Sequence, residues 1–127
     1  MGNVKIFFDG GCRPNPGRME TAVVARGVTF LDDDAGLGTN SDAEWLAAIH
    51  ALTVAATLGL RDVRLVGDSA LVVGQAKGSA KCRMLELAAH RDRFLDLAKG
   101  FASVRIRLIG RAQNLAGIAL ERHHGRR

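Results

Sequence analysis

The feature that most constrains the fold is an apolar segment that runs into an acid and then into a tight turn. Residues Val4 to Phe8 form an apolar run that predicts a buried β-strand. Asp9 follows directly, and Gly, Pro and Asn dominate positions 10–17. Turn chemistry explains those residues, because they supply fixed or positive φ angles. It does not explain Asp9, which we expect at the rim of a sheet, where the apolar strand ends.

The rest of the chain predicts more strands and then helices alternating with strands. Segments 21–25 and 27–31 are rich in β-formers, and their short connections favour an antiparallel meander. Strands that come first and then alternate with helices predict a three-layer α/β arrangement with a mixed sheet, in a single domain of residues 1–127. The further elements expected are a helix from the capping box at 41–44 to a stop at Gly59, a strand at 63–66, a helix at 69–75, a helix at 84–99, a strand at 104–108 and a helix at 114–121.

Charge and aromatic content narrow the classes of partner. The 127 residues carry a net charge of +5, and the pI near 10.0 favours a polyanionic partner such as nucleic acid. One Trp and no Tyr argue against a surface that stacks bases on aromatic rings.

Cysteine usage and apolar runs bear on the cellular compartment. Cys12 and Cys82 are too few for a disulfide framework and lack zinc spacing, so both are expected to be reduced thiols. No apolar run approaches the ~20 residues of a membrane span, and the first residues do not resemble a signal peptide. We therefore expect a cytoplasmic protein that does not enter a membrane.

Three carboxylates have competing explanations. Glu44 lies in the first turn of a predicted helix, where a capping box with Ser41 would account for it. Asp68 follows the strand predicted at 63–66 and could cap the next helix. Asp9 has no comparable structural role.

Taken together, the motifs around these acids resemble type 1 ribonuclease H. The segment 9–17, Asp-Gly-Gly-Cys-Arg-Pro-Asn-Pro-Gly, is similar to the opening motif of that family. Residues 39–48, Thr-Asn-Ser-Asp-Ala-Glu-Trp-Leu-Ala-Ala, resemble its Thr-Asn-Asn-x-x-Glu-x-x-Ala helix start. Val-Gly-Asp-Ser at 66–69 resembles its Asp-Ser strand end. The order and spacing agree over nearly the whole chain.

The resemblance implies a five-stranded mixed sheet with helices on both faces, and an endonuclease that hydrolyses the RNA strand of RNA–DNA hybrids. It makes Asp9, Glu44 and Asp68 the catalytic residues and the ligands of two metal ions, Mg²⁺ or Mn²⁺. Recognition of the hybrid would rest on 2′-hydroxyl contacts in the minor groove, and we expect a monomer. The positions implied to contact the substrate are Gly10, Gly11, Cys12, Asn15, Asn40 and Ser69.

The last helix departs from the family's pattern. A fourth acid is expected there in a motif like Asn-x-x-Ala-Asp-x-Leu, but the matching stretch 114–120 has Ile118 at that position and Gly117 before it. Glu121 lies one helical turn beyond Ile118 and could reach toward the same site. A site with three carboxylates is expected to bind metal more weakly, to prefer Mn²⁺ and to turn over slowly.

The loop at 109–113 departs as well, because it lacks the His that many members carry there. Arg111 could contact a phosphate instead, and His123 and His124 fall in a segment, 122–127, that is predicted to be a frayed basic tail. The basic segment 75–83, with Lys77, Lys81 and Arg83, is either a solvated linker or a phosphate-contacting loop.

Two rival functions stay open beside the nuclease that cuts RNA–DNA hybrids. The first is a catalytically impaired module that binds RNA–DNA hybrid or double-stranded RNA. The second is a nuclease of the wider superfamily that acts on branched DNA.

Overall fold

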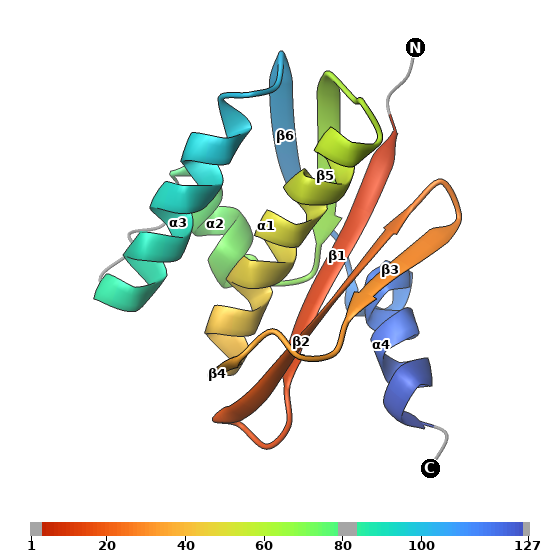
Figure 1. The fold of residues 1–127 in the computed structure, drawn as a ribbon, viewed down its shortest axis with the longest axis vertical. Coiled ribbons are helices and arrows are strands. Elements are labelled where there is room, and N and C mark those ends of the chain that lie inside the picture. The colour runs from red at the N-terminus through yellow and green to blue at the C-terminus, as the bar shows by residue number, and fades with distance from the viewer. Residues whose placement is uncertain (1–3, 79–83, 126–127) are drawn as a thin grey trace.

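The computed structural model describes residues 4–78 and 84–125 as a mixed sheet with helices on both faces (Figure 1). Five strands follow the order β3-β2-β1-β5-β6, and a short β4 pairs with β2. The strands β1 and β2 are antiparallel, whereas β5 runs parallel to both β1 and β6. The strands are β1 (Lys5–Cys12), β2 (Gly17–Ala25), β3 (Val28–Asp32), β4 (Leu37–Gly38), β5 (Asp62–Gly67) and β6 (Ser103–Leu108).

The helices divide unequally between the two faces of the sheet. Three helices lie on one face, and the last helix covers β1 and β2 from the other face (Figure 1). This arrangement confirms the predicted three-layer α/β fold with five strands in the main sheet. The helices are α1 (Asn40–Thr57), α2 (Ala70–Lys77), α3 (Leu85–Ala98) and α4 (Leu115–Gly125), and a 3₁₀ turn, η1 (Arg111–Gln113), precedes α4.

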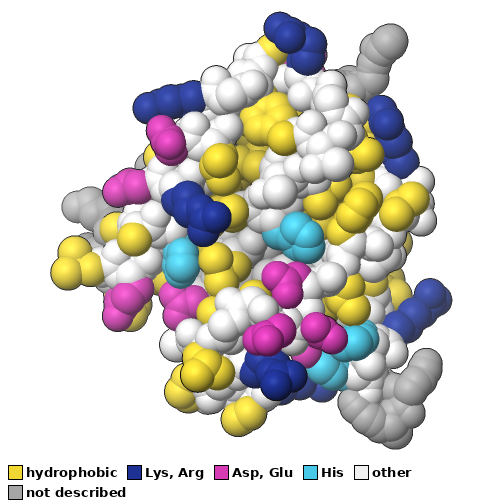
Figure 2. Space-filling model, in the orientation of Figure 1, with side chains coloured by type: hydrophobic (Ala, Val, Ile, Leu, Met, Phe, Trp, Pro, Cys, Tyr) yellow, Lys and Arg dark blue, Asp and Glu magenta, His cyan; other side chains and the backbone are white. Residues whose placement is uncertain are grey.

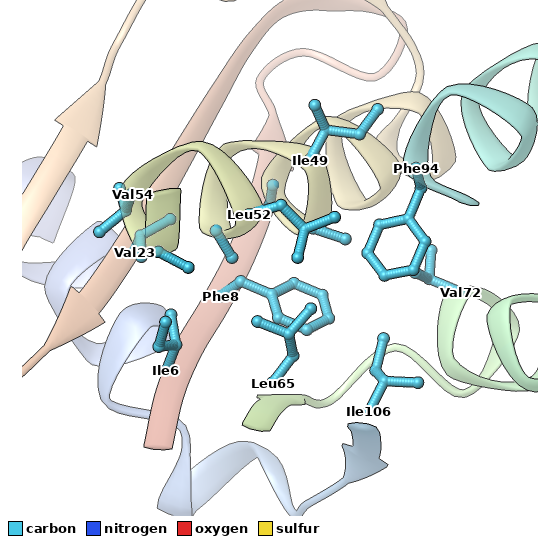
Figure 3. Close-up of a cluster of buried hydrophobic side chains, with 14 of the residues drawn as sticks. Ile6, Phe8, Val23, Ile49, Leu52, Val54, Leu65, Val72, Phe94 and Ile106 are labelled. Atoms are coloured by element: carbon cyan, nitrogen blue, oxygen red, sulfur yellow. The ribbon is translucent and has the colours of Figure 1, made fainter. Parts of the chain in front are cut away.

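Alternation along β1 sends its side chains to two different layers. Ile6 and Phe8 are fully buried in the core between the sheet and α1, where Leu52 and Leu65 surround them (Figure 3). Phe7 points the other way, into a smaller cluster formed with α4. Odd-numbered residues of β1 therefore face α4, and Asp9 is one of them.

The prediction that the first strand ends near Asp9 is wrong. It continues to Cys12, because residues 10–12 pair with residues 19–21 of β2, which itself begins at Gly17 rather than at position 21. The parallel partner β5 pairs only as far as Phe7 with Val66. Asp9 therefore lies inside β1 but beyond the last residue of β1 that pairs with β5. Its side chain is thus placed at the end of the sheet where β5 stops.

The capping box predicted at the start of α1 is wrong in its residues. The N-cap is Thr39, whose hydroxyl accepts from the Asp42 amide, while the Asp42 carboxylate accepts from the Thr39 amide. Asp68 is not a cap either, because Ser69 caps α2 by accepting from the Val72 amide. These local caps free Asp68 and Glu44 from helix termination.

Two further predictions fail at element boundaries. The helix α4 continues to Gly125, so the predicted tail is helical at residues 122–125. Gln75 does not begin a loop, because it is buried in α2 and accepts a hydrogen bond from Trp45 Nε1. Residues 79–83, which contain Lys81, Cys82 and Arg83, lie outside the described residues.

The structure bears on the expectations for the cysteines and for membrane-spanning segments. Cys12 is buried and is a free thiol in the part of the chain that the structure describes, whereas the redox state predicted for Cys82 stays a prediction. Among the described residues, no helix is both long enough and apolar enough to cross a membrane.

Candidate metal centre

The three acids singled out by sequence lie together. Asp9, Glu44 and Asp68 each offer one carboxylate oxygen, and these oxygens lie within 4.8 Å of one another. They come from β1, from the first turns of α1 and from the residue after β5. Segments far apart in the sequence thus meet at the edge of the sheet where β5 ends before β1.

Close backbone packing positions Glu44. The helix α1 approaches β1 so closely that a Cβ on Gly10 would lie 2.1 Å from the carbonyl oxygen of Ala43, so only glycine fits there. The Gly10 amide donates to Glu44 Oε1 at 3.4 Å. Gly10 therefore fixes Glu44 over the strand rather than only allowing a turn.

A buried asparagine fixes the helix on the other side of Asp9. Asn114 is fully buried just before α4, and its side-chain amide donates to the carbonyl of Phe8. Its side-chain oxygen accepts from the Ala116 amide in the first turn of α4. As a result Gly117 lies against the site, where an added Cβ would be 3.2 Å from Asp9 Oδ2.

The electrostatics of the cluster favour a bound cation. Burial raises the pKa of Asp9 to about 7, and the negative charge of Asp68 adds to the rise. Burial likewise raises the pKa of Glu44 to about 8, with the charges of Asp9 and Asp68 contributing. The charge of Arg111 opposes both rises in pKa, and its largely exposed guanidinium lies with Nε 3.9 Å from Asp68 Oδ2. A divalent cation would relieve this repulsion, and an all-carboxylate donor set suits Mg²⁺ or Mn²⁺.

The acids open into a cavity of about 360 Å³. Of the predicted substrate contacts, Gly10, Gly11, Cys12 and Asn40 line this cavity. Cys12 also anchors the opening turn, since its thiol donates to the carbonyls of Pro14 and Gly38.

Two predicted substrate contacts have structural partners instead. Asn15 Oδ1 accepts from the Asn40 amide at 3.1 Å, which joins the opening turn to the start of α1. The Ser69 hydroxyl is used as the cap of α2. Their roles toward a substrate stay predictions.

The expected fourth acid is absent from the cavity wall. Ile118 and Gly117 line it without offering an oxygen from a side chain. Glu121 also lines the cavity, but it is exposed and does not join the three acids within 4.8 Å.

Two cavity residues were missed by the sequence analysis. Glu20 lies on β2 and His124 on α4, and His124 Nε2 is 2.6 Å from Glu20 Oε1. Glu20 was missed because β2 was predicted to start at position 21, and His124 because it was assigned to a tail. Helical spacing gave a signal, since His124 follows Leu120 by four residues and shares its inward face.

Histidines and acids also meet at the outer surface of α4. His123 Nε2 lies 3.9 Å from Asp33 Oδ2, and Figure 2 shows histidine side chains beside acidic ones in this region. The end of α4 therefore contacts β2 through His124 and the residue after β3 through His123, and it is helical rather than frayed.

Comparison with known proteins shows which family the chain is similar to. The model of a family described as reverse transcriptase-like matches residues 8–124. A ribonuclease HI of Halobacterium salinarum is 36% identical over 128 residues, which cover 94% of this chain and 62% of that protein. The chain thus spans less than two thirds of that relative's length.

Solved structures agree in fold. The crystal structure of RNase H1 from the halophilic archaeon Halobacterium salinarum matches with a TM-score of 0.87 and 35% identity, covering 94% of each chain. LC11-RNase H1, crystallised in complex with an RNA/DNA hybrid, matches with a TM-score of 0.79 and 27% identity over 88% of each chain. The chain therefore belongs to the reverse transcriptase-like family, and its fold is that of type 1 ribonuclease H.

Proposed function

We propose that this chain is a metal-dependent endonuclease that hydrolyses the RNA strand of RNA–DNA hybrids. The observation that carries the proposal is the meeting of Asp9, Glu44 and Asp68 within 4.8 Å on the wall of an open cavity. The likeness to RNase H1 structures, one of them crystallised with an RNA/DNA hybrid, supports the substrate class.

The three carboxylates would hold the metal. Divalent ions bound there would supply an activated water and neutralise the oxygen that leaves the phosphate. The raised pKa values of Asp9 and Glu44 mean that metal competes with protons at these two side chains, so binding should strengthen as the pH rises toward 8. We expect Mn²⁺ to support activity better than Mg²⁺, since position 118 contributes no ligand.

The groups around the acids suit a phosphate backbone. Arg111 is 92% exposed beside Asp68 and would meet a phosphate next to the metal. Gly11 and the exposed Asn40 lie along the same cavity. Contacts of this kind read backbone and 2′-hydroxyl groups rather than base edges. The monomeric state and the cytoplasmic location stay predictions.

A second candidate is a module that binds hybrid without cutting it, which the absence of an acid at Ile118 favours. The variant Asp9→Asn separates the two functions. If the chain is a nuclease, cleavage of a labelled hybrid falls on the order of 10³-fold, because several kcal/mol of metal-dependent stabilisation is lost, while hybrid binding persists.

The matched control is Asp96→Asn, which alters a carboxylate that is 79% exposed on α3. It should cut at the wild-type rate. Binding of hybrid by the wild type with no cleavage in either Mg²⁺ or Mn²⁺ would instead establish the binding module.

A further inference from the structure

Glu20 is a buried acid on β2 that lies outside the cluster of Asp9, Glu44 and Asp68. Its side chain is 9% exposed, and it lies on the face of β2 where Ala22, Val24 and Leu120 form an apolar cluster. A carboxylate in such surroundings costs free energy unless it is paired or binds a metal. His124 supplies one partner, through Oε1. Among residues 4–78 and 84–125, Glu20 Oε2 accepts no hydrogen bond.

The register of the sheet aims Glu20 toward Asp9. Asp9 pairs with Ala22, and Gly11 pairs with Glu20, so Asp9 and Glu20 are diagonal neighbours on the same face. Such neighbours lie about 7–8 Å apart, within reach of a long side chain. Gly11 leaves the space between them open, since an added Cβ would contact only Leu120 Cδ1, at 3.9 Å.

The other two clustered acids come from α1 (Glu44) and from the residue after β5 (Asp68), whereas β2, which carries Glu20, is the neighbour of β1 on the opposite side. A site for two ions places them about 3.5–4 Å apart, and each ion needs ligands from the protein. On the other side of Asp9 the cavity wall is formed by α4 and β2, where Gly117 and Ile118 have no side-chain oxygen. The carboxylates on that side are Glu20, which is buried, and Glu121, which is exposed.

We propose that Glu20, oriented by His124, is a ligand of a second divalent cation beside Asp9, either directly or through a bound water. The inference rests on the proposed function and names the residue that replaces the missing acid. Mg²⁺ and Mn²⁺ sites often retain water ligands, so contact through a water is sufficient. A hydrogen bond from His124 to one oxygen of Glu20 would direct the other oxygen into the cavity, as groups around metal ligands commonly do.

The test is binding of Mn²⁺ alone, measured by isothermal titration calorimetry and by electron paramagnetic resonance. The wild type should bind two ions, and Glu20→Gln should keep one while the dissociation constant of the second rises about tenfold or more. His124→Gln should weaken the second ion less than Glu20→Gln does. Thermal unfolding without metal checks that each variant is folded.

Two matched variants sharpen the result. Glu86→Gln alters an exposed carboxylate on α3 and should bind both ions as the wild type does. Glu121→Gln should also leave both dissociation constants unchanged. Loss of the second ion in Glu121→Gln but not in Glu20→Gln would overturn the inference.

The inference and the proposed function fail in different ways. A wild type that binds one ion, or a Glu20→Gln variant with wild-type affinity for both ions, would overturn the role of Glu20 even if the hybrid is cut. A wild type that binds two ions but never cuts hybrid would overturn the nuclease function and leave the role of Glu20 standing.

Discussion

The two sides of Asp9 are built in different ways. On the side of α1, the backbone fixes the site: Gly10 lies in contact with the helix, and its amide donates to Glu44. On the side of α4, the wall consists of side chains that depend on distant partners, such as Glu20 and His124, which are 104 residues apart. A backbone-built side tolerates little change, whereas a side-chain-built side can exchange its acids while the fold persists.

The largest expected effect tests the backbone-built side. Gly10→Ala would place a Cβ 2.1 Å from the Ala43 carbonyl, and α1 must move away to relieve the clash. We expect the free energy of unfolding to fall by about 3 kcal/mol, as for severe overpacking. Urea unfolding followed by circular dichroism measures this loss.

Gly11→Ala is the matched control for Gly10→Ala. It sits one residue along the same strand on the opposite face, where the new Cβ meets Leu120 at an ordinary 3.9 Å. It should change stability by less than about 1 kcal/mol. Equal losses in the two variants would contradict the contrast between the two sides.

The residues on the α1 side could be predicted from the sequence because they fall in short, contiguous motifs. Gly10, Asn40 and Glu44 fall in two short segments whose order and spacing carry the resemblance. The role of Gly10 was misread as a turn, since no local pattern shows that a helix will pack directly on its Cα.

The α4 side was not readable in the same way. Finding Glu20 required the register of β1 with β2, which begins four residues earlier than its β-formers indicate. Finding His124 required the helix to continue into a polar, basic segment. Tertiary pairing stabilises that end, through the contacts of His124 with Glu20 and of His123 with Asp33.

The next prediction tests the charge balance around Asp9. Its pKa is raised from 3.8 to about 7 in the folded chain, so the native state binds more protons than the unfolded state between about pH 4 and 7. Without metal, the stabilising effect of proton binding is full below pH 4 and is lost as the pH rises through 7. Glu44 extends the loss toward pH 8.

We therefore expect the melting temperature of the metal-free wild type to fall by several degrees between pH 5 and pH 8. Asp9→Asn removes one of the groups and should flatten this dependence. Added Mn²⁺ should restore the melting temperature at pH 8 in the wild type but much less in Asp9→Asn. Identical pH profiles of the two proteins without metal would contradict the raised pKa of Asp9.

The smallest expected effect comes from adding an acid to the side-chain-built side. Ile118 is 37% exposed on the cavity wall, so Ile118→Asp adds a carboxylate to the cavity that holds Asp9. We expect the Mg²⁺ concentration for half-maximal cleavage of hybrid to fall severalfold, since an added carboxylate strengthens binding of a hard cation. Leu115→Asp, also partly exposed on α4 but not on the cavity wall, is the control and should leave the metal requirement unchanged.

If Glu20 already holds the second ion, Ile118→Asp should lower the metal requirement of Glu20→Gln more than that of the wild type, because the new acid then replaces a missing ligand instead of duplicating one. Equal gains in both backgrounds would show that position 118 and Glu20 act on separate ions.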